Sequence, residues 1–130
     1  MRSFILAINA ALLVGGFTSA QAQAAETIKI KVNHQKNAAG AHINVRFAKM
    51  IEDSRCPRDV QCIQAGNARI SIRVNRGKKA EVLTISTDPR NEIAHFEGYE
   101  FRLVGLTPEP RSNIRINPDG YVATIEISKR

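Results

Sequence analysis

The sequence predicts an all-β protein, and within that class an antiparallel β-sandwich that is immunoglobulin-like in size, with about seven strands. Three observations lead to this prediction. Short segments alternate apolar and polar residues with a period of two, and residues typical of turns separate these segments at short intervals. After residue 24, no segment sustains the periodicity of an amphipathic helix. A small β-barrel is the second choice.

The first half of the chain contains four of the predicted strands. Alternating apolar residues place them at 28–32, 43–47, 68–74 and 80–87. The stretch 33–41 is polar and contains small residues, so we expect a loop there. Asn75-Arg76-Gly77-Lys78 is a turn sequence, which predicts that the third and fourth of these strands form a hairpin.

The second half of the chain is more interrupted. Asp88-Pro89-Arg90-Asn91 ends the alternation, and 93–98 is ambiguous between strand and loop. A strand is predicted at 99–103, and the Pro108-Glu109-Pro110 segment ends it because proline lacks the N–H that a β-ladder requires. The turn sequence Asn117-Pro118-Asp119-Gly120 precedes the last predicted strand, at 121–127.

The N-terminus has the features of a secretory signal peptide. Arg2 precedes an apolar run at 4–17, and small residues follow it. The run is shorter than the ~20 residues that a membrane-spanning helix requires. We therefore expect cleavage after Ala24, with a signal peptide at 1–24 and one β-sandwich domain at 25–130. Because no cysteine lies near the cleavage site, we expect a periplasmic or secreted protein that is soluble and not lipid-anchored.

The two cysteines of the chain, Cys56 and Cys62, are predicted to form a disulfide bond. Paired cysteines in a small exported protein are typical of such bonds. Closing so short a loop contributes roughly 2–2.5 kcal/mol to stability in the chain-entropy model. A reactive thiol pair or a metal site is the alternative, but the C-x5-C spacing differs from the C-x-x-C of redox proteins and zinc ribbons.

The protein is basic. Its formal net charge of +7 becomes +6 when the signal peptide, which contains one charged residue, is removed. Outside the inner membrane, such a charge suits an anionic envelope polymer or an envelope protein as partner, and nucleic acid is not expected. The simpler interpretation is that a modest positive charge keeps a small monomeric domain soluble, because the basic residues are spread along the chain.

The stretch 52–66 concentrates charged residues around the predicted disulfide. Arg55, Arg58 and Asp59 are its candidate binding residues, because a rigid charged loop presents contacts at a low cost in conformational entropy. Asp53 and Ser54 are instead expected to hold the turn through local hydrogen bonds, including a pairing with Arg55.

Other functions are weighed against this one. His34 and His42 flank the polar loop and would be the ligands of a metal site, but their spacing matches no zinc or copper pattern, and no metal or other cofactor is expected. A constrained loop with Arg58 would suit an inhibitor of trypsin-like proteases. Catalysis is not expected, because there is no G-x-S-x-G motif and because adjacent Glu52 and Asp53 would face opposite sides of a strand.

The segment 53–66, D-S-R-C-P-R-D-V-Q-C-I-Q-A-G, resembles a signature of small exported bacterial proteins and lipoproteins of uncharacterised function, D-S-R-C-P-x-x-V-x-C-x-W-A-G. The similarity extends from Ile43 to the C-terminus. The departure is Gln64, where the signature has tryptophan, so an aromatic contact is not expected there. The resemblance implies an exported all-β domain and no activity.

The expected function is therefore that of an exported binding or envelope-associated module that presents the disulfide-pinned charged loop. A periplasmic metal- or small-ligand-binding protein is the alternative, and a protease inhibitor is the third hypothesis.

Overall fold

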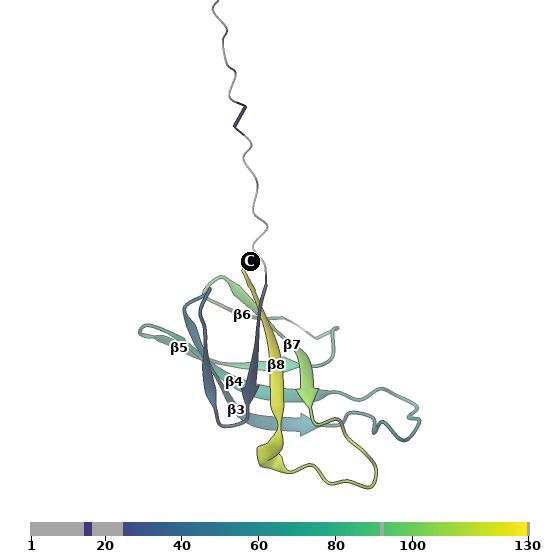
Figure 1. The fold of residues 1–130 in the computed structure, drawn as a ribbon. Coiled ribbons are helices and arrows are strands. Elements are labelled where there is room, and N and C mark those ends of the chain that lie inside the picture. Colours follow the sequence, from purple (N-terminus) through teal and green to yellow (C-terminus); the bar gives the residue numbers. More distant parts are fainter. Residues whose placement is uncertain (1–14, 17–24, 92, 130) are drawn as a thin grey trace, which may run out of the picture.

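Two antiparallel β-sheets of four strands each pack against one another in the computed structural model, which describes residues 15–16, 25–91 and 93–129 (Figure 1). The sheets do not close into a barrel, so the prediction of a β-sandwich is confirmed over the second choice. The predicted signal peptide lies outside the described residues, except for Gly15 and Gly16. Within the part of the chain that the structure describes, no helix has the length and hydropathy that crossing a membrane would need.

Sheet I consists of consecutive strands joined as a meander. Its order is β2-β3-β4-β5, with β2 at Gln35–Ala38, β3 at Ile43–Asp53, β4 at Ala68–Arg76 and β5 at Lys79–Ser86. The hairpin between β4 and β5 was predicted and is confirmed. Arg76 pairs with Lys79 across its tight turn, and Gly77 takes a φ of 58°, which glycine adopts without steric cost.

Sheet II combines the first strand of the domain with the last three. Its order is β1-β8-β7-β6, with β1 at Glu26–Lys31, β6 at Ala94–Phe96, β7 at Tyr99–Thr107 and β8 at Val122–Lys129. A single turn of 3-10 helix, η1 at Pro118–Gly120, precedes β8, and the side chain of Asn117 caps it by accepting a hydrogen bond from the backbone N–H of Asp119.

The strands of sheet I run across those of sheet II rather than alongside them (Figure 1). In such packings the chain passes from one sheet to the other at a sharp corner. The corner after β1 lies between two neighbouring residues. The N–H of Val32 donates to the carbonyl of Tyr121 beside sheet II (2.9 Å), whereas the N–H of Asn33 donates to the carbonyl of Phe47 in sheet I (2.8 Å). Asn33 has a φ of 65°, a conformation that asparagine tolerates better than most residues.

The core lies between the inner faces of the sheets. It consists of the apolar residues that alternate along the strands, and each such side chain contributes roughly 1.5–3 kcal/mol when fully buried. The largest of the fully buried side chains are Phe47, Phe101, Ile43, Ile70, Ile72, Ile125, Ile127, Val45 and Val74. These residues come from both sheets, so one core holds the sandwich together.

Strand β2 was not predicted, and its place at 33–41 was expected to be a loop. The reason for the error is that β2 is an edge strand with only one buried residue, Ala38, so it has no apolar alternation to detect. Strand β3 also continues past the predicted end at Phe47. Two register shifts, after Phe47 and after Met50, interrupt its alternation while its pairing with β4 continues to Asp53.

Candidate functional site

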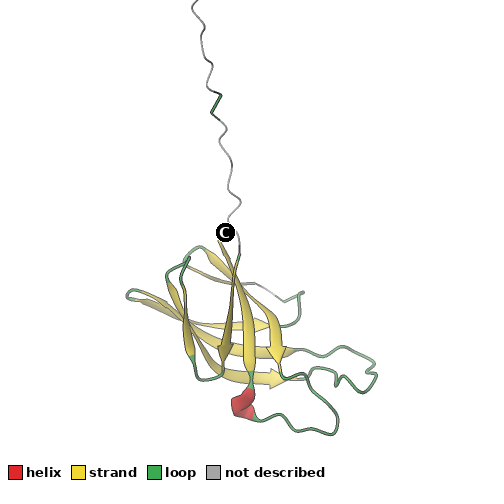
Figure 2. Ribbon diagram, viewed as in Figure 1, coloured by secondary structure: helices red, strands yellow, loops and turns green. Residues whose placement is uncertain are grey.

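Two long loops leave the sandwich at the same end (Figure 2). One, at 54–67, joins β3 to β4 and contains both cysteines, and we call it the disulfide loop. The other, at 108–117, leads from β7 to η1, and we call it the β7–η1 loop. Contacts between these two loops build the site that the sequence singled out.

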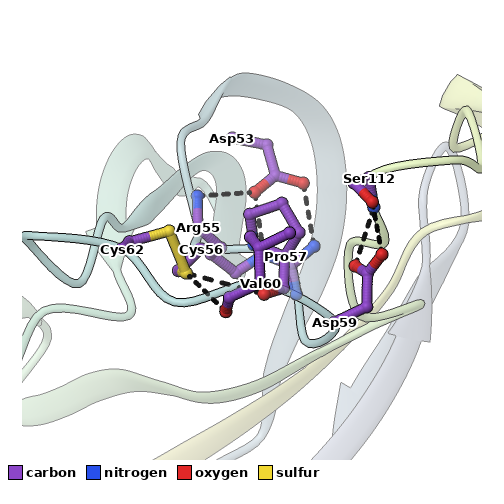
Figure 3. Close-up of a disulfide and its surroundings, with 8 residues drawn as sticks. All are labelled: Asp53, Arg55, Cys56, Pro57, Asp59, Val60, Cys62 and Ser112. Carbon is purple, nitrogen blue, oxygen red and sulfur yellow. Dashed lines mark hydrogen bonds and ion pairs between the residues drawn. A yellow bond between two sulfur atoms is a disulfide. The ribbon is translucent and has the colours of Figure 1, made fainter.

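A disulfide bond joins Cys56 to Cys62, with 6.0 Å between their Cα atoms, as predicted (Figure 3). The base of the loop is closed by a hydrogen bond from the N–H of Ser54 to the carbonyl of Asn67 (2.7 Å). Gly66 makes this closure possible, because a Cβ atom at this position would lie 1.5 Å from the carbonyl oxygen of Ser54. The glycine is therefore required by the close approach of two backbone segments.

Arg55 lies at the centre of the contacts between the loops. Its Nε and one Nη bind the two carboxylate oxygens of Asp53 at 2.7 and 2.8 Å, which is the bidentate geometry of strong arginine–carboxylate pairs (Figure 3). The same guanidinium donates to the backbone carbonyls of Leu106 (2.7 Å) and Pro108 (3.0 Å). These hydrogen bonds connect the end of β3 to the end of β7. The Arg55 side chain that makes them is only 13% exposed.

The hydroxyl of Tyr121, just before β8, donates to the second carboxylate oxygen of Asp53 (2.9 Å). Burial disfavours ionisation of Asp53, but hydrogen bonds from Arg55 and Tyr121 outweigh it and lower the pKa of this carboxyl. Burial and the hydrogen bond to Asp53 raise the pKa of Tyr121 to about 12. The pairing with Asp53 also raises the pKa of Arg55. We call these three residues, Asp53, Arg55 and Tyr121, the Arg55 clamp.

Asp59 and Arg58 hold the β7–η1 loop against the disulfide loop. The Asp59 carboxylate accepts hydrogen bonds from the backbone N–H (2.9 Å) and the hydroxyl of Ser112, and these bonds lower its pKa (Figure 3). The N–H of Arg58 donates to the carbonyl of Pro110 (2.9 Å), and its guanidinium pairs with Glu109. The three predicted binding residues thus lie in one loop, and each contacts another part of the chain. Arg58 (side chain 62% exposed) and Asp59 are exposed, whereas Arg55 is not.

The apolar residues at this end were not singled out from the sequence. Ile63 in the disulfide loop is fully exposed (103%), Val60 is 46% exposed, and Ile114 in the β7–η1 loop is 58% exposed. The available signal was the presence of two large apolar residues, Val60 and Ile63, within and directly after the otherwise polar segment that the cysteines close. An open hollow of about 650 Å³ is lined by Gln64, Ala65 and Gly66, which follow Ile63 in the chain, and by Thr87, Asp88, Pro89 and Arg90.

The structure does not bring His34 and His42 together. They lie at opposite ends of β2, since His34 precedes the strand and His42 follows it. The ring of His34 is instead within hydrogen-bonding distance of the carbonyl of Val32 (3.0 Å). Among the described residues, no three His, Cys, Asp or Glu side chains form a cluster suited to a metal ion.

The geometry around Arg58 gives no support to the inhibitor hypothesis. Residues 57–60 form a turn, with the N–H of Val60 donating to the carbonyl of Pro57 (3.3 Å). A protease cleft binds an extended segment whose backbone is free to pair, whereas the Arg58 N–H is already bonded to Pro110.

Comparison of the chain with models of protein families, with curated proteins and with solved structures finds no match. Functional conclusions therefore depend on the site alone.

Proposed function

We propose that this chain is an exported binding module and that the end bearing the disulfide loop docks on another protein of the cell envelope. The observation that carries the proposal is the full exposure of Ile63, which directly follows Cys62 in the cross-linked loop. A large apolar side chain held in water has no role in the core of the monomer, and exposed apolar groups on a fixed frame are typical of interaction sites.

Rigidity supports this assignment. The disulfide, the Arg55 clamp and the Asp59–Ser112 contacts fix the disulfide loop before any partner arrives. Docking on such a loop loses little conformational entropy, so more of the contact energy becomes affinity. An oxidising compartment is also where a disulfide of this kind persists, which agrees with export to the periplasm or the medium.

The chemistry of the end indicates what the partner offers. Val60, Ile63 and Ile114 are exposed apolar side chains that apolar surface of a partner would cover, and the hollow lined by residues 64–66 can accept a side chain of the partner. The partially exposed Arg58–Glu109 pair supplies a polar rim. An apolar centre with a polar rim is the usual arrangement of a protein–protein interface.

Site-specific photo-crosslinking in the native host tests the proposal. One probe replaces Ile63, and a matched probe replaces Val82, which is also apolar and exposed (65%) but lies on β5. We expect a discrete adduct from position 63 and none from position 82. The substitution Ile63→Ser should weaken co-purification of the captured protein roughly tenfold or more, as loss of a central interface side chain does. Val82→Ser should leave it unchanged.

Adducts of equal yield from both positions, or none from position 63, would contradict the proposal. A further control separates loop geometry from composition. The double variant Cys56→Ser/Cys62→Ser keeps Ile63 but releases the loop, so it should bind more weakly than the wild type. Equal binding by this variant would show that rigidity does not contribute.

A further inference from the structure

The outer face of sheet I carries two arginines directly opposite each other. Arg46 on β3 and Arg73 on β4 are register partners, and both side chains are exposed. Their neighbours along the strands, Val45, Phe47, Ile72 and Val74, are completely buried on the inner face, so the arginines point to solvent. Like charges at directly opposed positions of an antiparallel pair destabilise a sheet.

No acidic side chain compensates this repulsion among the described residues. The ion pairs that form there join other residues, and none involves Arg46 or Arg73. Sheet II shows the contrasting arrangement. There Arg102 lies opposite Glu126 and within 3.9 Å of Glu100, so an outward-facing arginine is flanked by acids. Acidic side chains thus balance the outward-facing Arg102 of sheet II, but among the described residues none balances Arg46 and Arg73 on the outer face of sheet I.

Amide side chains lie on the β2 side of the two arginines and in the next row, whereas the neighbour of Arg73 on β5 is the exposed Val82. Gln35 on β2 is the register partner of Arg46, which gives the row Gln35–Arg46–Arg73 across three strands. The next row on the same face is Asn37–Asn44–Asn75. These amides offer both hydrogen-bond donors and acceptors, and one N–H of the Asn44 amide already donates to Oδ1 of Asn37 (2.8 Å). Because neighbouring strands lie about 4.8 Å apart, each row spans about 10 Å.

The face is hollowed at this place. A depression of about 430 Å³ is lined by Gln35, Asn44, Arg46, Arg73, Asn75, Gly77 and Ala80. None of these is aromatic, so the face of a neutral sugar would find no ring to stack on. Recognition here depends on hydrogen bonds, and the strongest are those from a guanidinium to an anionic oxygen.

We propose that this depression on the outer face of sheet I, the Arg46–Arg73 face, binds a sugar unit that carries a carboxylate, as part of an acidic polysaccharide. The two guanidinium groups bind the carboxylate oxygens. Gln35, Asn44 and Asn75 exchange hydrogen bonds with the hydroxyl groups of the same ring. Bound carboxylate also removes the repulsion between the arginines. This site is separate from the disulfide loop and does not depend on the docking proposed there.

The inference is tested by titrating the folded 25–130 domain with tetragalacturonate. Calorimetry measures the affinity, and backbone amide chemical shifts locate the binding site. Removal of a charged hydrogen bond costs about 1.5 kcal/mol or more, which is roughly tenfold in affinity. We therefore expect Arg46→Gln/Arg73→Gln to weaken binding about a hundredfold. The matched control Lys29→Gln/Lys31→Gln removes the same charge from exposed positions on β1 in sheet II, and should change affinity by about twofold or less at physiological salt.

Three further measurements separate this ligand from others. The methyl-esterified oligomer, which lacks the charge, should not bind measurably. Inorganic phosphate should bind much more weakly than tetragalacturonate, because it cannot reach the amides. Phosphatidylglycerol vesicles should not compete for the site. Shift changes should centre on β2, β3 and β4.

Equal losses of affinity for tetragalacturonate in the arginine and lysine double variants would overturn the inference, because net charge alone would then account for binding. Absence of tetragalacturonate binding, equal affinity for phosphate, or vesicle binding that is abolished by Arg46→Gln/Arg73→Gln would each overturn it as well. Circular dichroism and the melting temperature should confirm that both double variants remain folded, since none of the replaced side chains is buried.

Discussion

Arginines in two regions of this molecule have opposite surroundings. Arg55 in the clamp is nearly buried, binds the Asp53 carboxylate through two hydrogen bonds and donates to two backbone carbonyls. Arg46 and Arg73 on sheet I are exposed, face each other and have no acidic partner among the described residues. The first arrangement stabilises the fold, whereas the second opposes it. The surroundings of an arginine, rather than its presence in a charged stretch, thus indicate whether it is available to a ligand.

The largest effect is expected from Arg55→Ala. This change leaves the Asp53 carboxylate without its cation and removes the donor that Arg55 supplies to the carbonyls of Leu106 and Pro108. Breaking a buried ion pair costs 3–5 kcal/mol, and the small remaining exposure places this one at about 3 kcal/mol. Urea denaturation would measure the change. Arg55→Lys should retain less than half of the stabilisation that Arg55→Ala removes, since an ammonium group cannot reproduce the planar fork of donors of a guanidinium.

The exposed Arg58 provides the control for that measurement. Arg58→Ala should change the free energy of unfolding by about 0.5 kcal/mol or less, because its pair with Glu109 is largely in water. A loss below about 1 kcal/mol in Arg55→Ala, or equal losses in the two variants, would mean that the clamp does not stabilise the fold and that the comparison fails.

The disulfide is expected to contribute less than the clamp. Replacing both cysteines by serine avoids a free thiol and should lower the free energy of unfolding by about 2 kcal/mol, since only a short loop is released. Far-UV circular dichroism should keep its β signal. Hydrogen exchange should accelerate in the disulfide loop and stay unchanged at the far end of β3 and β4, where Val45 pairs with Val74. Loss of the β signal would show that the bond holds more than the loop.

Acid should weaken the clamp through the Asp53 carboxylate. The pKa of Asp53 is lowered in the folded protein, so its ionised form stabilises the fold at pH values above its ordinary pKa of 3.8. This stability is lost as the pH falls below that value through the lowered pKa. The advantage of the wild type over Asp53→Asn should therefore be constant between pH 5 and 7 and should shrink below about pH 4. A constant advantage down to pH 2, measured by denaturation, would contradict the pairing.

The fold could be predicted where a strand buries alternate residues. The segment 68–74 is an example, because its four alternating apolar positions are all buried in β4, which additionally buries Ser71. Strand β2 escaped prediction because an exposed edge strand imposes no such pattern. The pairing of Asp53 with Arg55 was predictable because the two residues are two positions apart. The bonds from Arg55 to Leu106 and Pro108 were not, since they join residues more than 50 positions apart.

The Arg46–Arg73 face shows a second limit of the sequence. Both arginines were placed on predicted strands, with their side chains away from the apolar positions. Whether they are opposite each other depends on the register between β3 and β4, and that register includes shifts after Phe47 and Met50. A slip of one residue would turn either side chain to the other face. Alternation therefore predicts which face a residue occupies but not which residue lies beside it.

The smallest expected effect has the opposite sign and is the sharpest test of the comparison. Arg73→Glu replaces a repulsive cross-strand pair with an attractive one, which should raise the free energy of unfolding by about 0.5 kcal/mol. Arg73→Gln removes the repulsion alone and should give a smaller gain. Because both positions are exposed, 0.5 M salt should reduce these gains, as screening would. The same variants should bind tetragalacturonate more weakly, by roughly tenfold for Arg73→Gln and more for Arg73→Glu. A variant that becomes more stable while losing its ligand would indicate that Arg73 is retained for binding, whereas a loss of stability would place it with Arg55 among the residues that hold the fold together.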